Sequence, residues 1–296
     1  MKNEIDFYSK KTRCSALYYK TNLKKPNGII VMAHGLGGVK ELWIDKFASF
    51  FAKNGYECFL FDYRNHGTSD GNKRQLVNVK DQLIDWNNAI DFVKNNLNQN
   101  NKNIILFGSS FSGGHVIKLL SERKDIKMAI SQCPYTDTLA TVKTFSLFSM
   151  IKLMLSAILD LLTCVTGYHP YTLLLANESG KKALMKVANY DAYEKRIPKN
   201  LKVINKAPAR TVFEFLKYSP GKYFKKIDKP IFVSPCLKDN LAPAYKTIEL
   251  AKKCKSATIK EYNCHHFDIY FDDLFEESSK DYLKFLNKYT INSKNN

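Results

Sequence analysis

Hydrophobic residues occur along this chain in two alternating patterns. Short continuous apolar runs, among them Gly28–Ala33 and Cys58–Phe61, have the length and composition of strands that are covered on both faces. Between such runs, apolar residues recur at spacings of three and four, most clearly across residues 79–97, which predicts amphipathic helices. Strands that alternate with helices in this way predict an α/β fold with a mostly parallel central sheet flanked by helices.

The alternation is interrupted once. It breaks near Thr138 and resumes at Pro230, where a new apolar run begins. A chain of 296 residues with 45% hydrophobic content can bury one large core and also carry an insertion. We therefore expect residues 1–137 and 230–296 to form the core, and residues 138–229 to form a largely helical cap inserted into it.

A Gly/Ser-rich segment, Gly108–Gly114, lies between one predicted strand and the helix that follows it. This is the layout of a nucleophile elbow, in which a sharp strand-to-helix turn exposes a serine hydroxyl. The turn needs small residues two positions before and two after the serine, and Gly108 and Ser112 have that spacing around Ser110. The same segment would also suit an ordinary loop or a phosphate-binding loop, so its surroundings decide its role.

An acid that could act with Ser110 follows later in the chain. In a fold with such an elbow the order is serine, acid, histidine, with the acid and the histidine after late strands. Asp239 follows the apolar run Ile231–Cys236 and is the acid that we favour. Asp137, which follows the earlier run Met128–Cys133, is a rival that we rank lower.

The histidine belongs to an adjacent pair. His265 and His266 both follow the strand-like run Ala257–Tyr262, and the register of the loop decides which of them reaches the serine. Asp268 lies a few residues further on, where we expect it to form local hydrogen bonds. A serine with a histidine base and an orienting carboxylate is the arrangement that nucleophilic acyl transfer requires.

Two backbone N–H groups are expected to stabilise negative charge on the reacting carbonyl oxygen. One is that of Phe111, directly after the serine. The other is that of Leu36, in the glycine-rich loop His34–Gly38 that follows the strand Gly28–Ala33. His34 itself is expected to brace this loop and to take no part in proton transfer.

The chain is strongly basic, with a net charge of +18. We attribute this charge to a lysine-rich solvated surface, and attraction to anionic membranes, nucleic acid or acidic ligands is the alternative. No RNP-like, zinc-finger or helix-turn-helix signature is present, so we expect no nucleic-acid partner. The sequence shows neither a metal-ligand cluster nor the spacing of a dinucleotide-binding loop, so we expect neither a metal nor a cofactor.

The seven cysteines are odd in number, and none has C-x-x-C spacing. Several lie in apolar strand-like runs, which favours reduced, buried thiols and a cytoplasmic location over a disulfide framework. The first residues contain no apolar stretch of the kind found in signal peptides.

The segment Phe145–Thr163 in the predicted cap is apolar except for a narrow polar stripe at helical spacing. Lys152 and Asp160 lie in that stripe and make a membrane-spanning helix unfavourable. We favour a cap helix over the active site whose apolar face lines an acyl pocket. Two alternatives stay open, a helix on a membrane surface, which would make the protein peripheral to a membrane, and a homodimer contact.

Together these motifs resemble those of the serine α/β-hydrolase superfamily. The segments that carry the resemblance are His34–Gly38, Asp62–Gly71, the elbow around Ser110, Asp239 with Pro243, and His266–Tyr270. More narrowly, the segments Ser110–Val116, Arg74–Trp86 and Cys133–Asp137 are similar to a subgroup of uncharacterised bacterial hydrolases related to fungal polyketide transferases and dienelactone-hydrolase-like proteins. The resemblance implies the α/β-hydrolase fold and selects His266 over His265 as the base. Asn65 departs from the pattern, because the superfamily usually has glycine there.

The function that follows is hydrolysis of carboxylic esters or thioesters of small molecules with apolar acyl groups. Ser110, His266 and Asp239 are the predicted triad, and the reaction passes through an acyl-enzyme. An acyltransferase of the same fold is the first alternative. A binding protein of this fold with an idle triad is the second.

Overall fold

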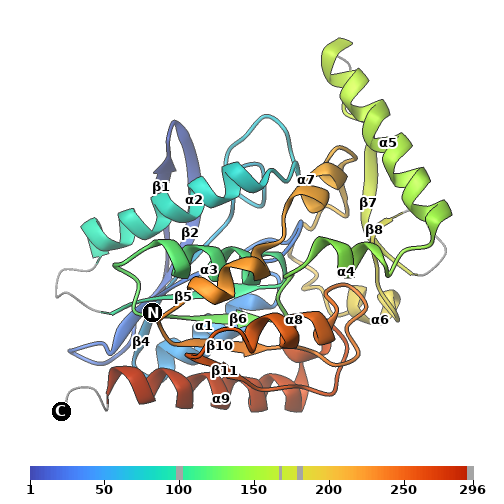
Figure 1. The fold of residues 1–296 in the computed structure, drawn as a ribbon. Coiled ribbons are helices and arrows are strands. Elements are labelled where there is room, and N and C mark those ends of the chain that lie inside the picture. Colours follow the sequence, from blue (N-terminus) through green and yellow to red (C-terminus); the bar gives the residue numbers. More distant parts are fainter. Residues whose placement is uncertain (98–102, 167–168, 179–182, 292–296) are drawn as a thin grey trace.

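The computed structural model describes residues 1–97, 103–166, 169–178 and 183–291. Its central element is an eight-stranded sheet with the strand order β1-β2-β4-β3-β5-β6-β10-β11 (Figure 1). The strands are β1 Lys2–Ser9, β2 Thr12–Tyr19, β3 Gly28–Ala33, β4 Tyr56–Phe61, β5 Ile104–Ser109, β6 Met128–Gln132, β10 Ile231–Ser234 and β11 Ala257–Ile259. β2 pairs antiparallel with β1 and β4, and the other neighbours are parallel, which confirms the predicted sheet.

Two apolar cores lie on opposite faces of this sheet. Along β3, Ile30 and Met32 belong to one core, whereas Ile29 and Val31 belong to the other. Because successive side chains of a strand point to opposite faces, a strand buried on both faces has to be apolar at every position. This is why the predicted strands appear in the sequence as continuous apolar runs.

The helices that cover the two faces come from different parts of the chain. Phe47 of α1 and Tyr282 of α9 pack into the first core, and Trp86 of α2 and Ile117 of α3 pack into the second. The helices of the core are α1 Ile44–Lys53, α2 Val79–Phe92 with its π-helical extension η1 Val93–Leu97, α3 Phe111–Glu122, α8 Ala244–Ala251, the 3₁₀ helix η3 Asp268–Tyr270 and α9 Asp272–Thr290.

Residues 138–229 combine helices with a small sheet. The helices are α4 Thr138–Val142, α5 Leu147–Thr166, α6 Tyr190–Glu194, α7 Thr211–Lys217 and the 3₁₀ helix η2 Pro220–Lys226. The sheet has the order β8-β7-β9, with β7 Thr172–Asn177, β8 Ala183–Lys186 and β9 Lys206–Pro208. The sequence analysis did not anticipate this sheet, because its strands are short and their apolar pattern is weak. η2 packs against α3 of the core.

A third apolar cluster joins the inserted segment to the core. It contains Leu36 and Phe111 from the core together with Leu153, Leu173 and Val212 from the inserted segment. The insertion therefore lies over the elbow and the loop after β3, which is the region where the sequence places the site.

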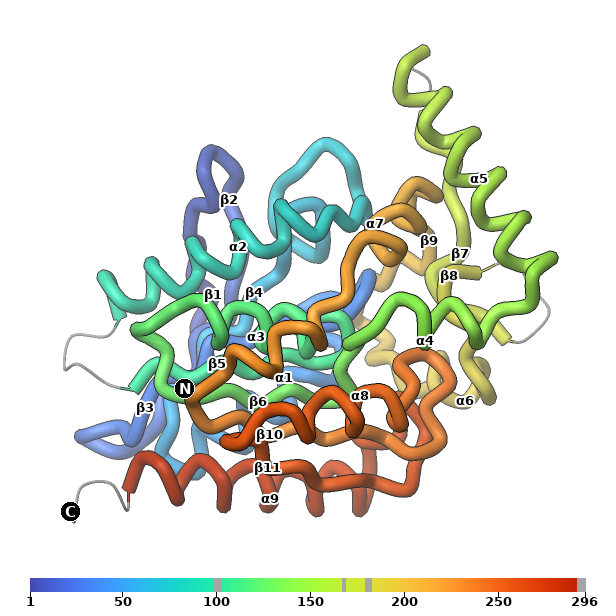
Figure 2. The backbone as a smooth tube through the Cα atoms, viewed as in Figure 1, coloured from blue at the N-terminus to red at the C-terminus, as the bar shows by residue number. Residues whose placement is uncertain are grey.

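The helix α5 extends away from the body of the molecule (Figures 1 and 2). Within the described residues, it is the one helix that is long and apolar enough to cross a membrane, judged by length and composition alone. Only about a fifth (22%) of that apolar stretch is buried inside the structure. A core helix of this composition would be mostly buried, whereas most of the apolar surface of α5 is exposed.

All seven cysteines are free thiols, and six of them are buried. This agrees with the reduced, buried thiols that the sequence predicts. Cys164, on α5, is the exposed one.

Candidate active site

Ser110 occupies a strained turn between β5 and α3. Its backbone has φ 57° and ψ −116°, a conformation that residues other than glycine rarely adopt. Close packing enforces the turn, because a Cβ atom on Gly108 would lie 2.1 Å from the carbonyl oxygen of Ser112. A Cβ atom on Gly113 would lie 2.8 Å from Pro134. Gly108, one of the two small residues predicted around the serine, is therefore required sterically, and so is Gly113.

The structure brings the three predicted triad residues into one hydrogen-bonded chain. The Ser110 hydroxyl lies 2.9 Å from His266 Nε2, which accepts its hydrogen bond. His266 Nδ1–H donates to Asp239 Oδ2 at 2.5 Å. Asp239 stands in the loop after β10 and His266 in the loop after β11, so the carboxyl ends of parallel strands bring both toward the elbow.

The carboxylate of Asp239 is held in place by its own loop. Its Oδ1 accepts the backbone N–H groups of Leu241 at 2.7 Å and Ala242 at 2.9 Å. Oδ2 remains to orient His266, in the role that an orienting acid has in a triad. Burial of His266 by itself would lower the pKa of its imidazole, but the adjacent Asp239 carboxylate and the Cys133 thiol outweigh burial and raise that pKa well above its usual value.

The rival residues have other partners. Asp137 caps the first turn of α4, where its Oδ1 accepts the Ala140 N–H at 2.8 Å. His265 Nδ1–H donates to the Lys238 carbonyl at 3.1 Å. Asp268 accepts the His265 backbone N–H at 2.8 Å, a local bond of the kind expected from the sequence.

The loop after β3 lies directly against the serine. A Cβ atom on Gly35 would lie 2.8 Å from Ser110 Cβ and 3.3 Å from its Oγ, so only glycine fits there. Leu36 follows Gly35 and lines the same cavity as Ser110. Phe111 is the first residue of α3, and the N–H groups of a first helical turn have no partner within the helix. These two backbone groups are therefore positioned near the serine, and their role as an oxyanion hole stays a prediction.

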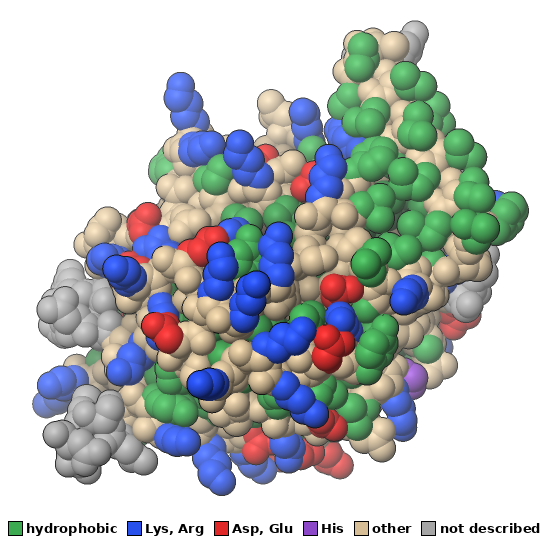
Figure 3. Space-filling model, in the orientation of Figure 1, with side chains coloured by type: hydrophobic (Ala, Val, Ile, Leu, Met, Phe, Trp, Pro, Cys, Tyr) green, Lys and Arg blue, Asp and Glu red, His purple; other side chains and the backbone are tan. Residues whose placement is uncertain are grey.

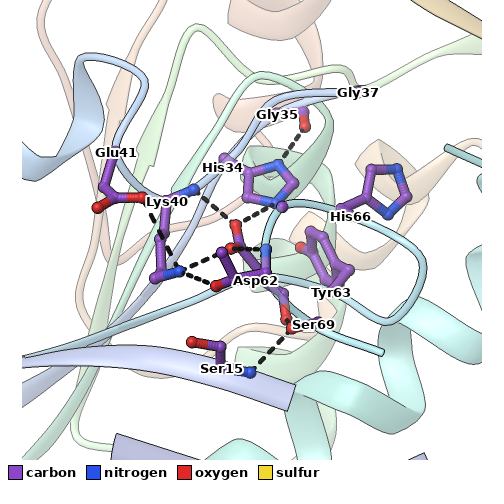
Figure 4. Close-up of polar contacts among 12 residues, drawn as sticks. Ser15, His34, Gly35, Gly37, Lys40, Glu41, Asp62, Tyr63, His66 and Ser69 are labelled. Carbon is purple, nitrogen blue, oxygen red and sulfur yellow. Dashed lines mark hydrogen bonds and ion pairs between the residues drawn. The ribbon is translucent and has the colours of Figure 1, made fainter. Parts of the chain in front are cut away.

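A buried ion pair fixes this loop to the end of β4 (Figure 4). Asp62 Oδ1 accepts the Lys40 backbone N–H at 2.7 Å, and Oδ2 accepts its Nζ at 2.9 Å. Both side chains are almost fully buried. Asp62 Oδ2 also accepts the Thr68 N–H at 3.1 Å, and His34 Nδ1–H donates to the Gly35 carbonyl at 2.8 Å. The Asp62 carboxylate at the end of β4 thus fixes the segment that follows β3 through Lys40.

Asn65, the residue that departs from the superfamily pattern, stands at a turn with φ 67°. Asparagine tolerates this left-handed conformation better than most residues other than glycine. Its side-chain oxygen also accepts the Lys73 N–H at 3.2 Å. The turn is therefore kept without the usual glycine.

Ser112 links the elbow to the loop after β3. Its hydroxyl donates to the His34 carbonyl at 2.5 Å and contacts the Tyr63 hydroxyl. Tyr63 in turn accepts the indole N–H of Trp86 at 2.7 Å. The sequence predicts a small residue at this position and leaves open whether the Ser112 hydroxyl also tunes the elbow. Tyr63 lies in the segment Asp62–Gly71, which carries part of the resemblance to the superfamily. That position was the only feature of the sequence that pointed to these hydrogen bonds.

Cys133 is a further neighbour that sequence reasoning missed. Its Sγ lies 4.0 Å from His266 Nε2 and 3.6 Å from Ser109 Oγ, and the side chain is buried. It directly follows β6, the strand next to β5, and parallel neighbours end at the same edge of the sheet. That adjacency was visible only once the strand order was known.

Two cavities meet at Ser110. The first is almost wholly apolar and also has His266 in its wall; its other lining residues include Phe111, Tyr135, Met150, Leu153 and Phe215. The second lies on the side of the loop after β3 and also contains polar groups from Tyr190, Glu194 and Asn205. Among the described residues, no group of three or more His, Cys, Asp or Glu side chains is arranged to hold a metal ion.

Comparisons with known proteins agree with this architecture. A family model described as "alpha/beta hydrolase fold" matches residues 28–273. The quorum-quenching protein AidA of Acinetobacter baumannii is 34% identical over 286 residues, covering 96% of this chain and 94% of the relative. The polyketide transferase ATR5 of Stachybotrys chlorohalonatus is 26% identical over 212 residues, covering 68% of this chain and 67% of the relative.

A solved structure shows the same fold over the whole chain. The α/β hydrolase GrgF from Penicillium sp. superimposes with a TM-score of 0.83 at 21% identity, covering 98% of this chain and 99% of that one. The match to the family model covers most of the sequence, and the similarity to AidA extends from end to end. The chain therefore belongs to the α/β-hydrolase fold family, as the motifs predicted.

Proposed function

We propose that this α/β-hydrolase is a serine hydrolase that cleaves carboxylic ester or thioester bonds in substrates with apolar acyl groups. One observation carries the proposal: Ser110, His266 and Asp239 form a continuous hydrogen-bonded chain at the wall of an apolar cavity. A serine oriented in this way toward a histidine and a buried acid is equipped for nucleophilic attack on an acyl carbon.

In the first half of the reaction, Ser110 Oγ attacks the substrate carbonyl carbon while its proton passes to His266 Nε2. Asp239 keeps the proton on Nδ1 and stabilises the imidazolium that forms. The carbonyl oxygen, now negatively charged, would accept the N–H groups of Leu36 and Phe111. The imidazolium then gives its proton to the departing alcohol or thiol, and the acyl group remains on Ser110.

In the second half, water attacks the acyl-enzyme by the same route in reverse. His266 takes a proton from water, the hydroxide oxygen bonds to the acyl carbon, and the proton returns to Ser110 Oγ as the acid leaves. No oxidant, metal or cofactor enters either half-reaction.

The lining of the first cavity supports an apolar acyl group. Its wall is built from aromatic, leucine and methionine side chains, and few polar atoms are exposed in it. Transfer of a hydrocarbon chain from water into such a wall is favourable in proportion to the apolar area buried. We therefore assign this cavity to the acyl chain.

An active-site fluorophosphonate probe tests the proposed nucleophile. The wild-type protein should be labelled, and Ser110→Ala should abolish labelling. Ser121→Ala is the matched control, because Ser121 lies on the same helix with its hydroxyl bonded to the Lys118 carbonyl, and it should label like wild type. Failure of the folded wild-type protein to label would refute the proposal.

A substrate panel then defines the bond and the acyl length. It should contain short- and long-chain p-nitrophenyl esters and acyl-CoA thioesters. Quorum-sensing signals with an ester bond belong in it too, because the relative AidA is named a quorum-quenching protein. We expect the ratio kcat/KM to rise with acyl length until the apolar cavity is filled.

Acyl transfer is the second candidate, and the second cavity favours it. This cavity reaches Ser110 from the side of the loop after β3 and could hold an alcohol or thiol that replaces water. A relative of this chain is named a polyketide transferase. Product analysis with competing nucleophiles distinguishes the two activities, since a transferase gives a new ester or thioester in preference to the free acid.

A further inference from the structure

The outer face of α5 is a continuous apolar surface that nothing in the described structure covers. Six of its apolar side chains are between 48% and 86% exposed: Leu147, Phe148, Ile151, Leu155, Leu162 and Val165. At 100° per residue they occupy one side of the helix. Figure 3 shows the hydrophobic side chains of α5 gathered along the part of the molecule that extends from the body.

The opposite face of α5 is fixed to the protein. Leu153 and Ala157 are buried there, and so is Asp160. Asp160 accepts the Arg210 backbone N–H at 2.9 Å and faces its guanidinium at 3.4 Å. Crossing a bilayer would strip this carboxylate of its partner and place it in hydrocarbon, which is costly. The helix can therefore lie on an apolar phase but is not built to span one.

The charges on and beside α5 favour a lipid surface with anionic headgroups. No acidic side chain is exposed on α5, since its one carboxylate is the buried Asp160. Lys152 lies on the helix with its ammonium 4.1 Å from the centre of the Phe148 ring. At the start of the helix, Lys186 donates to Ser149 Oγ at 2.9 Å. Long lysine side chains beside an apolar stripe can reach headgroups while the stripe is immersed.

A second copy of the chain is the less suitable occupant. Each copy carries a net charge of +18, so two copies approaching through these faces would repel each other. An anionic membrane attracts the same charge. The helix has 20 residues, which is about 30 Å at 1.5 Å per residue, so it could lie flat along a bilayer surface over its full length.

From these observations we propose that the outer face of α5 docks onto a membrane surface that carries anionic headgroups. The apolar side chains enter the boundary between headgroups and acyl chains, and Asp160 stays on the protein side, paired with Arg210. The proposal concerns binding alone and does not depend on the proposed hydrolase activity.

Vesicle flotation of the full chain tests the proposal. The vesicles should contain phosphatidylcholine with about 30% phosphatidylglycerol, and pure phosphatidylcholine vesicles show the contribution of charge. Wild type should float with the anionic vesicles, and less with the neutral ones. The double variant Leu155→Glu/Leu162→Glu should lower the partition coefficient at least about 100-fold, since each immersed leucine contributes roughly tenfold.

The matched control is Leu23→Glu/Tyr245→Glu. It also replaces two exposed apolar residues, 51% and 62% exposed, and changes the net charge by the same amount. This control should float like wild type. Circular dichroism and thermal unfolding confirm that both variants are folded. If wild type fails to float, or if both variants lose binding equally, the proposal is wrong.

An added indole gives a second readout. The native Trp43 and Trp86 are buried, so the variant Leu155→Trp carries one exposed tryptophan on the proposed surface. Its emission should shift to shorter wavelength with anionic vesicles, and brominated lipids should quench it. Light scattering tests whether a second copy of the chain covers this face instead. The proposal would be overturned if the wild type is a dimer, the variant Leu155→Glu/Leu162→Glu is a monomer, and the wild type does not bind vesicles.

Discussion

Replacing Ser112 with alanine should slow the reaction more than it weakens substrate binding. The Ser112 hydroxyl donates to the His34 carbonyl at 2.5 Å, and His34 begins the loop that carries Leu36. The same hydroxyl contacts Tyr63, whose oxygen accepts the Trp86 N–H. Without the Ser112 hydroxyl, the loop His34–Gly38 loses one of its bonds to the elbow, and the buried His34 carbonyl loses this donor.

The size of the effect follows from the burial of the group. A buried polar group that loses its hydrogen-bond partner costs about 1–3 kcal/mol. If this cost appears fully as a loss of oxyanion stabilisation in the transition state, kcat falls about 5- to 150-fold. KM should change little, because Ser112 is not one of the residues that line the apolar cavity assigned to the acyl chain.

The assay is steady-state hydrolysis of the best p-nitrophenyl ester, combined with urea unfolding. Ser278→Ala is the matched control, because Ser278 is also buried and donates to a carbonyl, that of Phe275, at 3.2 Å on α9. The control should lose stability and keep kcat. If Ser112→Ala loses as much stability as the control and keeps its kcat within twofold of wild type, then Ser112 is merely a small residue in the turn.

Three further predictions concern the groups around the serine. Gly35→Ala places a Cβ atom 2.8 Å from Ser110 Cβ and should lower kcat at least about tenfold, measured with the same ester; an unchanged kcat would show that the loop can retreat. Lys40→Met leaves the Asp62 carboxylate buried without its cation and should reduce the free energy of unfolding by about 3–5 kcal/mol in urea; a loss below about 1 kcal/mol would contradict a structural role. Asp239→Asn should lower kcat roughly 10³–10⁴-fold. Because the base must be unprotonated and this carboxylate raises the pKa of the imidazole, the rise of kcat/KM with pH should also move to lower pH; a rise that stays in place would refute the assigned electrostatic role.

The fold and the order of the site residues could be predicted from the sequence because each depends on local pattern. A strand buried on both faces is apolar throughout, as in β3, and an elbow needs small residues at fixed spacing, as at Gly108 and Ser112. The order of strands then gave the positions of Ser110, Asp239 and the pair His265 and His266, and the resemblance to the superfamily selected His266 from that pair. The structure places these three side chains in contact, and their catalytic roles stay predictions until the labelling experiment.

Contacts between distant segments could not be predicted in this way. The bond between Ser112 and Tyr63 joins residues 49 positions apart, and that between Asp62 and Lys40 depends on a loop conformation. Trp86 fitted the apolar face of its predicted helix, so its N–H group gave no sign of a hydrogen-bond partner. Cys133 lies beside His266 only because β6 is the neighbour of β5 in the sheet.

The helix α5 shows why periodicity alone is insufficient for such a segment. The sequence shows which side of an apolar helix is polar, but it does not show whether that side faces water or the protein. In this protein two of the four buried residues of α5, Ser156 and Asp160, are polar, whereas its exposed side is predominantly leucine and isoleucine. A helix that only covered an acyl pocket would have the reverse arrangement, with polar residues outside. An exposed apolar side of this kind is expected when the outer face is covered by another apolar surface, and the vesicle experiment on Leu155 and Leu162 directly tests whether that surface is a membrane.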